Sequence, residues 1–216
     1  MAILEVRRLN AGYGRARVLF DIDLDADAGE VVALLGRNGA GKSTTLKAIM
    51  GLVPPLSGEI VFDNKNLKNL EPYEIARLGL GYVPEDRRIF TDLTVAENID
   101  VGRQPPRQTL PAWTQDRLFG LFPALAGLRE RRGARISGGE QQMLCIARTL
   151  AGNPTAILLD EPSEGLAPVV VDHVARAIVE LKRAGVTVLL AEQSRHFSER
   201  VADRAYILEK GVISKL

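Results

Sequence analysis

The chain has 216 residues, of which 46% are hydrophobic and 25% are charged, with one cysteine and a formal net charge of +1. This length and composition support one domain with a smaller lobe. The small net charge argues against nucleic-acid binding driven by overall positive charge, so we expect no nucleic-acid partner. A lone cysteine excludes an internal disulfide framework and fits a reducing compartment. The apolar runs are shorter than the ~20 residues that cross a bilayer, and the first residues lack a signal peptide's apolar core. We therefore expect a cytoplasmic chain that is soluble when isolated.

The first segments predict an antiparallel β part followed by a buried strand and a helix. Residues 3–9 read ILEVRRL, and residues 18–26 read VLFDIDLDA, in which apolar positions alternate. Such segments are typical of half-buried antiparallel strands. Residues 30–36, EVVALLG, form a continuous apolar run typical of a buried parallel strand, and residues 41–50 have a helical pattern.

A glycine-rich turn joins that buried strand to that helix. Its pattern is Gly36-x-x-x-x-Gly41-Lys42-Ser43, and its position after a strand and before a helix is what a P-loop requires. Backbone amides of such a loop wrap phosphates, and Lys42 would reach the β- and γ-phosphates as a positive charge. The Ser43 hydroxyl would be a Mg²⁺ ligand, because hard cations take oxygen donors.

The middle of the chain is interpreted as a helical insertion. After a strand-like segment, GLGYVP at residues 79–84, residues 85–151 contain helical patterns and no convincing strand. A proline-rich break, GRQPPRQTLPAW at residues 102–113, is expected to be an exposed loop. The basic cluster that follows is interpreted as a solvated face and consists of Arg129, Arg131, Arg132 and Arg135.

The heptad ISGGEQQ, residues 136–142, opens a further helix in which Cys145 falls on the apolar face. Two glycines let the backbone approach a ligand, and a helix N-terminus attracts anions through its free N–H groups and its dipole. The same residues fit an ordinary capping box equally well, with Ser137 at the N-cap and Glu140 three residues later. Both interpretations remain open at this stage.

The next buried strand, residues 157–161, reads ILLDE and places two acids at its end. Beside a P-loop, Asp160 would hold Mg²⁺ directly or through water, and Glu161 would orient or deprotonate the attacking water. The alternative is that the two acids merely cap the next turn.

The last part of the chain continues the alternation of strands and helices. Helices are predicted over residues 168–184 and 194–202, and strands over residues 187–192 (TVLLAE) and 205–209 (AYILE), with a strand-like GVISKL at the end. Alternation of this kind predicts an α/β sheet that binds its ligand at the carboxyl ends of its strands.

The P-loop, the SGG helix and the acidic strand, in this order, resemble the signature of ATP-binding cassette (ABC) ATPases. The resemblance covers almost the whole chain and implies an α/β P-loop NTPase fold with a mixed, largely parallel core sheet. It also implies an N-terminal antiparallel β subdomain and an inserted helical subdomain. Within one domain spanning 1–216, residues 1–84 and 152–216 would form the nucleotide-binding core and about 85–151 the helical subdomain.

The resemblance implies ATP and Mg²⁺ as cofactors and gives further residues a role. Tyr13 matches the aromatic residue that stacks on adenine in this family. In the family two such domains bind head to tail, so Ser137, Gly138 and Gly139 would contact the γ-phosphate of ATP held by a partner chain. The residues expected to hold nucleotide within this chain are Tyr13, Gly36, Asn38, Gly39, Gly41, Lys42, Ser43 and Thr44.

Three positions depart from the usual pattern of the superfamily. Glu85 stands where a glutamine near Mg²⁺ and the attacking water is usual, and Gln193 stands where a histidine usually bonds the γ-phosphate. Glu85 and Gln193 are therefore candidate catalytic residues beside Glu161, and Glu85 is a candidate metal ligand beside Ser43 and Asp160. Ala167 replaces an aspartate that usually contacts the opposing subunit.

These departures, together with EDRRIF, LTVAENI, LFPALAGLRERRG and SEGLAP, resemble the LivF-type ATPase subunit of bacterial importers for branched-chain and related amino acids. That resemblance implies three partners: a second ATPase subunit, transmembrane permease subunits and, indirectly, a periplasmic or extracellular solute-binding protein. It places the chain at the cytoplasmic face of the inner or plasma membrane. Residues 85–90 are expected to dock on the permease because they join the ATP core to the helical subdomain, and the alternative is a solvated basic turn. The alternative is an ABC-type ATPase that acts on nucleic acid, the ribosome or a protein complex. A P-loop kinase or GTPase would leave SGGEQQ unexplained.

Overall fold

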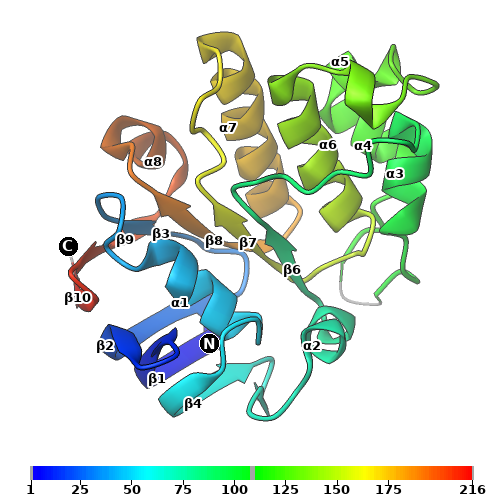
Figure 1. Cartoon of the computed structure of the whole chain (residues 1–216). Helices are drawn as coiled ribbons and strands as arrows, with labels where there is room; N and C mark the ends of the chain where they lie inside the picture. Colours follow the sequence, from blue (N-terminus) through cyan, green and yellow to red (C-terminus); the bar gives the residue numbers. More distant parts are fainter. Residues whose placement is uncertain (1, 108–109, 216) are drawn as a thin grey trace.

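The computed structural model describes residues 2–107 and 110–215 and contains two β-sheets flanked by helices (Figure 1). The smaller sheet is antiparallel and has the order β2 (Ala16–Asp27), β1 (Ala2–Tyr13), β4 (Pro55–Phe62), β5 (Lys65–Asn66). The larger sheet has the order β10 (Val212–Lys215), β9 (Arg204–Glu209), β3 (Val31–Leu35), β8 (Thr187–Glu192), β7 (Ala156–Asp160), β6 (Leu80–Val83). All its described pairings are parallel except β10 with β9. The expected fold class is therefore confirmed.

Helices cover the larger sheet and also form a separate lobe. Those next to the core strands are α1 (Lys42–Ile49), α2 (Pro72–Leu78), α7 (Pro168–Arg183) and α8 (Arg195–Val201). The upper right of Figure 1 holds α3 (Val95–Val101), α4 (Gln115–Leu121), α5 (Pro123–Ala126), the 3₁₀ turn η1 (Gly133–Arg135) and α6 (Gly138–Leu150). No strand occurs in the described part of residues 85–151, as expected; Thr94 and Arg132 form an isolated bridge.

Alternate residues of the buried strands serve two different cores. Leu158 packs with Leu46 and Ile49 of α1 in the core toward the antiparallel sheet, whereas Ile157 and Leu159 face the core toward α6 and α7. Successive side chains of a strand point to opposite faces, so a strand covered on both faces must be apolar throughout. This explains why the core strands read as continuous apolar runs rather than as alternating ones.

Three elements were absent from the sequence prediction. Strand β4 carries Pro55 and Gly58 and begins with exposed side chains, so its sequence looks like a turn. Gly58 has φ +98°, and a Cβ there would lie 2.5 Å from the carbonyl oxygen of Arg8, so only glycine fits this close pairing. Strand β5 has two residues and α2 only seven, which is too short for a clear period.

The prediction that residues 102–113 form an exposed loop is wrong for the end of the segment. Trp113 is buried in the hydrophobic cluster of the helical lobe, and its backbone N–H donates to Asn153 Oδ1 at 2.7 Å. Arg107 donates to the carbonyls of Arg77 and Asn153 at 2.9 and 2.8 Å. The segment lacks regular structure because of its prolines, yet these bonds fix it to the rest of the chain; Gln108 and Thr109 lie outside the described residues.

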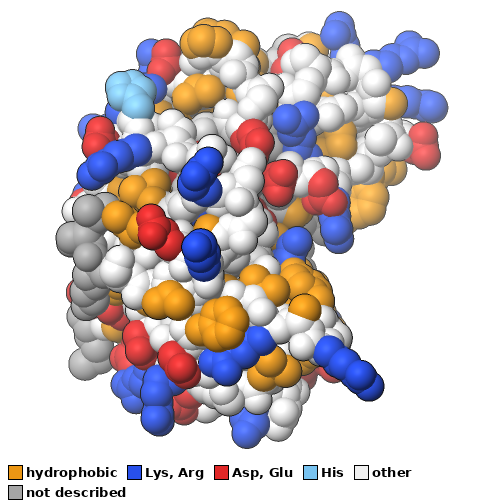
Figure 2. Space-filling model, turned by 60° about the vertical axis from the view of Figure 1, so that its left-hand side comes forward, with side chains coloured by type: hydrophobic (Ala, Val, Ile, Leu, Met, Phe, Trp, Pro, Cys, Tyr) orange, Lys and Arg blue, Asp and Glu red, His pale blue; other side chains and the backbone are white. Residues whose placement is uncertain are grey.

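No helix among the described residues is long and apolar enough to cross a membrane. On the face shown in Figure 2, acidic and basic side chains are interspersed, in keeping with the small net charge.

Cys145 lies on the buried face of α6, as expected for a small core residue, and burial raises the pKa of its thiol to about 11. Because of this raised pKa, its thiolate fraction at pH 8 should be about a hundredth of that of an ordinary exposed thiol. Only the thiolate is the nucleophile, so the rate of alkylation should fall with this fraction. We predict that maleimide labels the folded chain at least about 100-fold more slowly than the chain in denaturant. Mass spectrometry of timed samples measures this, and equal rates would contradict the burial of Cys145.

Candidate functional site

The P-loop connects β3 to α1 and has an unusual backbone that glycines permit. Gly39 and Gly41 have φ of +79° and +113°, and Gly41 is the N-cap of α1. A Cβ at Gly36 would lie 2.5 Å from the carbonyl oxygen of Leu208 in β9, so this glycine lets the loop pack against the sheet. Asn38 and Gly39 are exposed, while Thr44 is buried in the first turn of α1. The loop thus presents backbone amides at a helix N-terminus, which is a phosphate-binding arrangement.

Lys42 lies inside this loop and is paired with the acid at the end of β7. Its Nζ donates to the carbonyls of Gly36 and Arg37 at 2.7 and 3.2 Å and lies 2.8 Å from Glu161 Oε1. The Lys42 and Glu161 side chains are only 4% and 5% exposed. Glu161 adopts φ +49°, rare for a non-glycine residue, and its Oε2 accepts the backbone N–H of Gln193 at 3.1 Å. A strained backbone held by specific bonds is common at functional sites.

Asp160 is fixed by two hydroxyl groups. Ser43 Oγ donates to its Oδ1 at 2.9 Å, and Tyr82 Oη donates to its Oδ2 at 3.1 Å. Burial raises the pKa of the Asp160 carboxyl, the two hydrogen bonds oppose this, and the negative charge of Glu85 adds to the rise. Burial and the adjacent Asp160 charge raise the pKa of the Tyr82 hydroxyl, which keeps it a donor.

The donor set here suits a magnesium ion that is shared with a phosphate ligand. Ser43 and Asp160 offer a hydroxyl and a carboxylate oxygen, the hard ligands that Mg²⁺ prefers. The described residues contain no cluster of three or more His, Cys, Asp or Glu side chains that would hold a metal alone. Phosphate oxygens and water would have to complete the coordination, which is how nucleotide-bound Mg²⁺ is usually held.

The structure places the remaining predicted residues around this centre with different exposure. Gln193 is exposed and lines, together with residues 36–40, a cavity of about 780 Å³. Glu85 is exposed just beyond β6, close enough to Asp160 for its charge to act there. Tyr13 is 51% exposed at the end of β1, and the adjoining strand β2 packs Leu19 against the P-loop at Gly41. The phenol ring of Tyr13 is accessible for stacking.

The SGG residues are both a helix cap and a tightly packed corner. The capping box forms, with Ser137 N donating to Glu140 Oε2 at 2.6 Å and Glu140 N donating to Ser137 Oγ at 3.3 Å. A Cβ on Gly138 would lie 2.7 Å from the Arg87 guanidinium, and a Cβ on Gly139 would lie 2.8 Å from Val170 of α7. In Figure 1 the N-terminal end of α6 lies at the top of the view, whereas α1 lies below the core sheet. Ser137 and Gly138 are exposed, so the start of α6 is accessible to a ligand from outside the chain.

Sequence reasoning missed three residues that the structure adds to this region. Tyr82 holds Asp160, and Arg148 of α6 donates to the carbonyl of Arg88 at 2.7 Å. Buried Glu192 accepts the N–H groups of Ser163 and Ser194 at 3.0 and 3.3 Å, which ties the loop after Glu161 to the loop that carries Gln193. Burial is the main cause that raises the pKa of Glu192. A polar residue at the end of an apolar strand was the available signal for Tyr82 and Glu192, but Arg148 had none.

Comparison with known proteins identifies the family. The sequence model of the family described as ABC transporter matches residues 19–164. The chain belongs to the ABC transporter ATP-binding family.

Relatives of this ABC protein cover nearly all of it. It is 41% identical to the high-affinity branched-chain amino acid transport ATP-binding protein BraG of Pseudomonas aeruginosa, over 98% of this chain and 91% of the relative. It is 37% identical to the lipopolysaccharide export system ATP-binding protein LptB of Escherichia coli K12, over 98% and 88% of the two chains. It is 33% identical to the probable branched-chain amino acid transport ATP-binding protein LivF of Archaeoglobus fulgidus, over 98% and 90%.

A solved ATP-binding subunit of an ABC transporter superposes on the ABC fold with a TM-score of 0.86 at 31% identity, covering 99% of this chain and 90% of that one. As a member of this family the chain is an ATP-binding ATPase whose hydrolysis is coupled to transport.

The packing of Gly139 against Val170 gives a direct test of the corner at the start of α6. We predict that Gly139→Ala destabilises the protein by about 1–3 kcal/mol, because the new methyl group must displace a valine in a packed interface. Val170→Ala added to Gly139→Ala should recover most of the loss, since it removes the clashing methyl groups. Denaturant unfolding of both single variants and the double variant measures the coupling. Additive losses would show that Val170 does not restrict this position.

Proposed function

We propose that the chain is the ATP-hydrolysing subunit of a bacterial ABC importer for branched-chain amino acids or related small solutes. One observation carries the enzymatic part: Lys42, Ser43, Asp160 and Glu161 meet in one cluster where β3 and β7 end. The identity to BraG and the similarity to LivF support the class of solute. The similarity to LptB makes an exporter the competing hypothesis.

In this proposal the P-loop amides and Lys42 bind the phosphates of ATP, and Tyr13 stacks on the adenine. Ser43 and Asp160 hold Mg²⁺, which supplies positive charge at the phosphates, and Glu85 contributes an oxygen from the edge of the site. When a phosphate oxygen replaces Glu161 as the counterion of Lys42, the Glu161 carboxylate becomes available to orient or deprotonate a water molecule. The Gln193 amide donates a hydrogen bond to the γ-phosphate without adding charge.

The chain needs a second ATPase subunit in this proposal. Ser137 and Gly138 are exposed and Gly139 is half-buried at the start of α6, and this terminus would contact the γ-phosphate of ATP on the partner's P-loop. ATP then favours the closed pair because it contacts both chains, and hydrolysis removes that preference. Residues 85–151 would move with this terminus as the helical subdomain, while residues 1–84 and 152–216 form the nucleotide-binding core.

The permease would dock in a groove between these two parts. A cavity of about 430 Å³ lies there, bordered by the ends of α1, α2, α3, α6 and β6. Leu52, Phe90 and Val101 are exposed around it, and Arg88 and Arg148 add positive charge. A permease helix with apolar and acidic side chains would match this lining, which would hold the chain at the cytoplasmic face of the membrane.

Purification from native membranes tests the assignment to an importer. We expect the chain to copurify with a permease and with a solute-binding protein that binds a branched-chain amino acid. Recovery with lipopolysaccharide-export components would contradict import, and recovery with ribosomes or DNA would contradict transport.

Glu161→Gln tests the role of the carboxylate in hydrolysis. We predict that ATP turnover falls roughly 100- to 10,000-fold, the range for loss of a general base, while ATP binding is retained and the closed pair accumulates. Glu164→Gln is the matched control, because Glu164 is an exposed acid in the same loop. Single-turnover hydrolysis and size-exclusion chromatography with ATP measure the two effects. Undiminished turnover in the Glu161 variant would rule out its assigned role.

Two inactive variants test whether the SGG residues act across the pair. Ser137→Arg should damage the site on the partner's P-loop, whereas Lys42→Ala damages the chain's own site. If the chain pairs with itself, mixing these two variants restores one intact site out of two and should recover ATP hydrolysis. If it pairs with a different subunit, Ser137→Arg should inactivate that subunit's site. Two results would contradict action in trans. One is no recovery of hydrolysis when the two variants of a self-pairing chain are mixed. The other is loss only at the chain's own P-loop when the Ser137→Arg chain pairs with a different subunit.

A further inference from the structure

Tyr82 connects two parts of the molecule that the proposed function uses separately. Its hydroxyl donates to Asp160 Oδ2 at 3.1 Å, while Ser43 donates to Oδ1 of the same carboxylate. Both oxygens of Asp160 are therefore oriented by the protein. Groups that orient a metal ligand in this way usually tune metal affinity as much as position.

The strand pairing explains why this tyrosine reaches Asp160. Tyr82 pairs with Leu158 in the parallel ladder of β6 and β7, and Asp160 lies two residues after Leu158. Residues two apart on a strand share a face, so the Tyr82 ring and the Asp160 carboxylate both point toward α1. Among the described strands, β6 is the outermost one next to β7, which places Tyr82 at the edge of the sheet.

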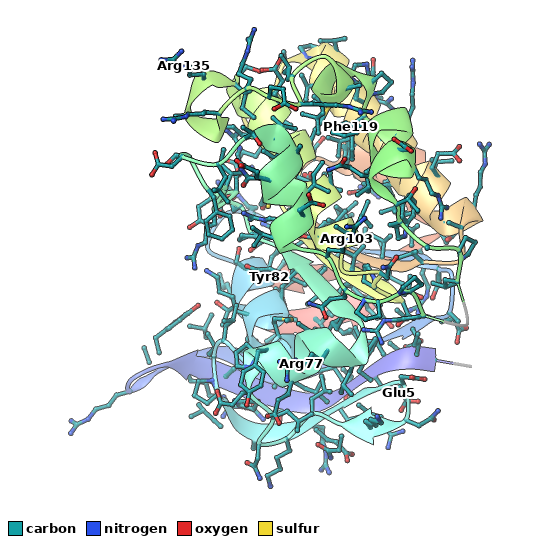
Figure 3. The ribbon with its side chains drawn as sticks, turned by 90° about the vertical axis from the view of Figure 1, so that its right-hand side faces the viewer. Glu5, Arg77, Tyr82, Arg103, Phe119 and Arg135 are labelled. Carbon is teal, nitrogen blue, oxygen red and sulfur yellow. The ribbon has the colours of Figure 1, made fainter. Side chains whose placement is uncertain are left out.

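Tyr82 also borders the groove between the two parts of the chain. Tyr82 lines that cavity together with Phe90, Val101 and Arg148. Figure 3 shows Tyr82 at the level where the upper helices meet α1 and the antiparallel sheet below. A side chain seated in the groove would therefore contact Tyr82, the residue whose hydroxyl holds Asp160.

We propose that Tyr82 is a positioning residue that orients the Asp160 carboxylate for Mg²⁺ and makes this orientation depend on what occupies the groove. This inference rests on the proposed Mg²⁺–ATP site and adds a residue to it. The hydroxyl acts on the carboxylate, and the ring transmits contact from the groove. Tyr82 touches neither nucleotide nor reacting water in this role.

Tyr82→Phe removes the hydroxyl and keeps the ring. We expect ATP binding without Mg²⁺ to be unchanged. The Mg²⁺ concentration that gives half of the maximal increase in ATP affinity should rise roughly 3- to 10-fold. This is less than the loss of metal affinity that usually follows removal of such a hydrogen-bond partner, because phosphate also binds the ion. Fluorescent ATP titrations in EDTA and at graded Mg²⁺ measure this, with thermal unfolding to confirm an intact fold. Tyr73→Phe is the control, because Tyr73 is an exposed tyrosine on α2.

Asp160→Asn separates failure of this inference from failure of the proposed site. If it abolishes the Mg²⁺ dependence and Tyr82→Phe has no effect, Tyr82 does not position the carboxylate. If it leaves the Mg²⁺ dependence intact, the proposed metal site is itself wrong.

The complex copurified with its permease tests the link to the groove. In the wild-type protein, assembly with the permease should shift the Mg²⁺ concentration for half-maximal ATP binding relative to the isolated chain. In Tyr82→Phe that shift should disappear while the permease still copurifies. An equal shift in both proteins, or no shift in the wild type, would overturn the link.

Discussion

The buried contact between Lys42 and Glu161 is the interaction around which the nucleotide-binding region is arranged. The two residues come from distant parts of the sequence and meet because β3 and β7 run parallel on either side of β8, so their carboxyl ends share one edge of the sheet. Both strands are fully buried, which fixes the depth at which the loop and the acid emerge. The glycines then allow the loop to curl around the lysine without a side chain in the way.

Burying two charges is costly unless each keeps a partner, and removal of one member of a buried pair typically costs about 3–5 kcal/mol. Lys42 keeps two carbonyls and one carboxylate, and Glu161 keeps Lys42 and the Gln193 N–H. A phosphate group is one of the few ligands that can take over from Glu161, because it brings its own negative charge. In the proposed function, this exchange of counterions would release the Glu161 carboxylate in the same step in which nucleotide binds. The buried Lys42–Glu161 pair thus accounts both for the electrostatic cost of the site and for the carboxylate that the proposed hydrolysis uses.

The sequence was sufficient for features that depend on neighbouring residues. The P-loop, the acidic strand and the start of α6 could be predicted because spacing and strand-helix context determine them. The two interpretations of Ser137 are compatible, since the capping box uses the N–H groups of Ser137 and Glu140, whereas helix geometry leaves other first-turn N–H groups free. Features that depend on tertiary proximity were missed. Tyr82 reaches Asp160 because β6 pairs with β7, and the backbone of Trp113 is held by Asn153 from another segment.

Residues 82–90 also constrain how Asp160 and the start of α6 can move relative to each other. At one end Tyr82 holds Asp160, and at the other Arg148 of α6 donates to the carbonyls of Arg87 and Arg88. These two arginines have φ of +62° and +47°, conformations that cost a non-glycine residue about 1–3 kcal/mol each and persist only where other contacts hold them. The Arg87 guanidinium lies against Gly138 at the start of α6. A displacement of this segment must therefore break the Arg148 bonds or carry α6 with it. Under the proposed function, contact in the groove would then act on both Asp160 and the N-terminal end of α6.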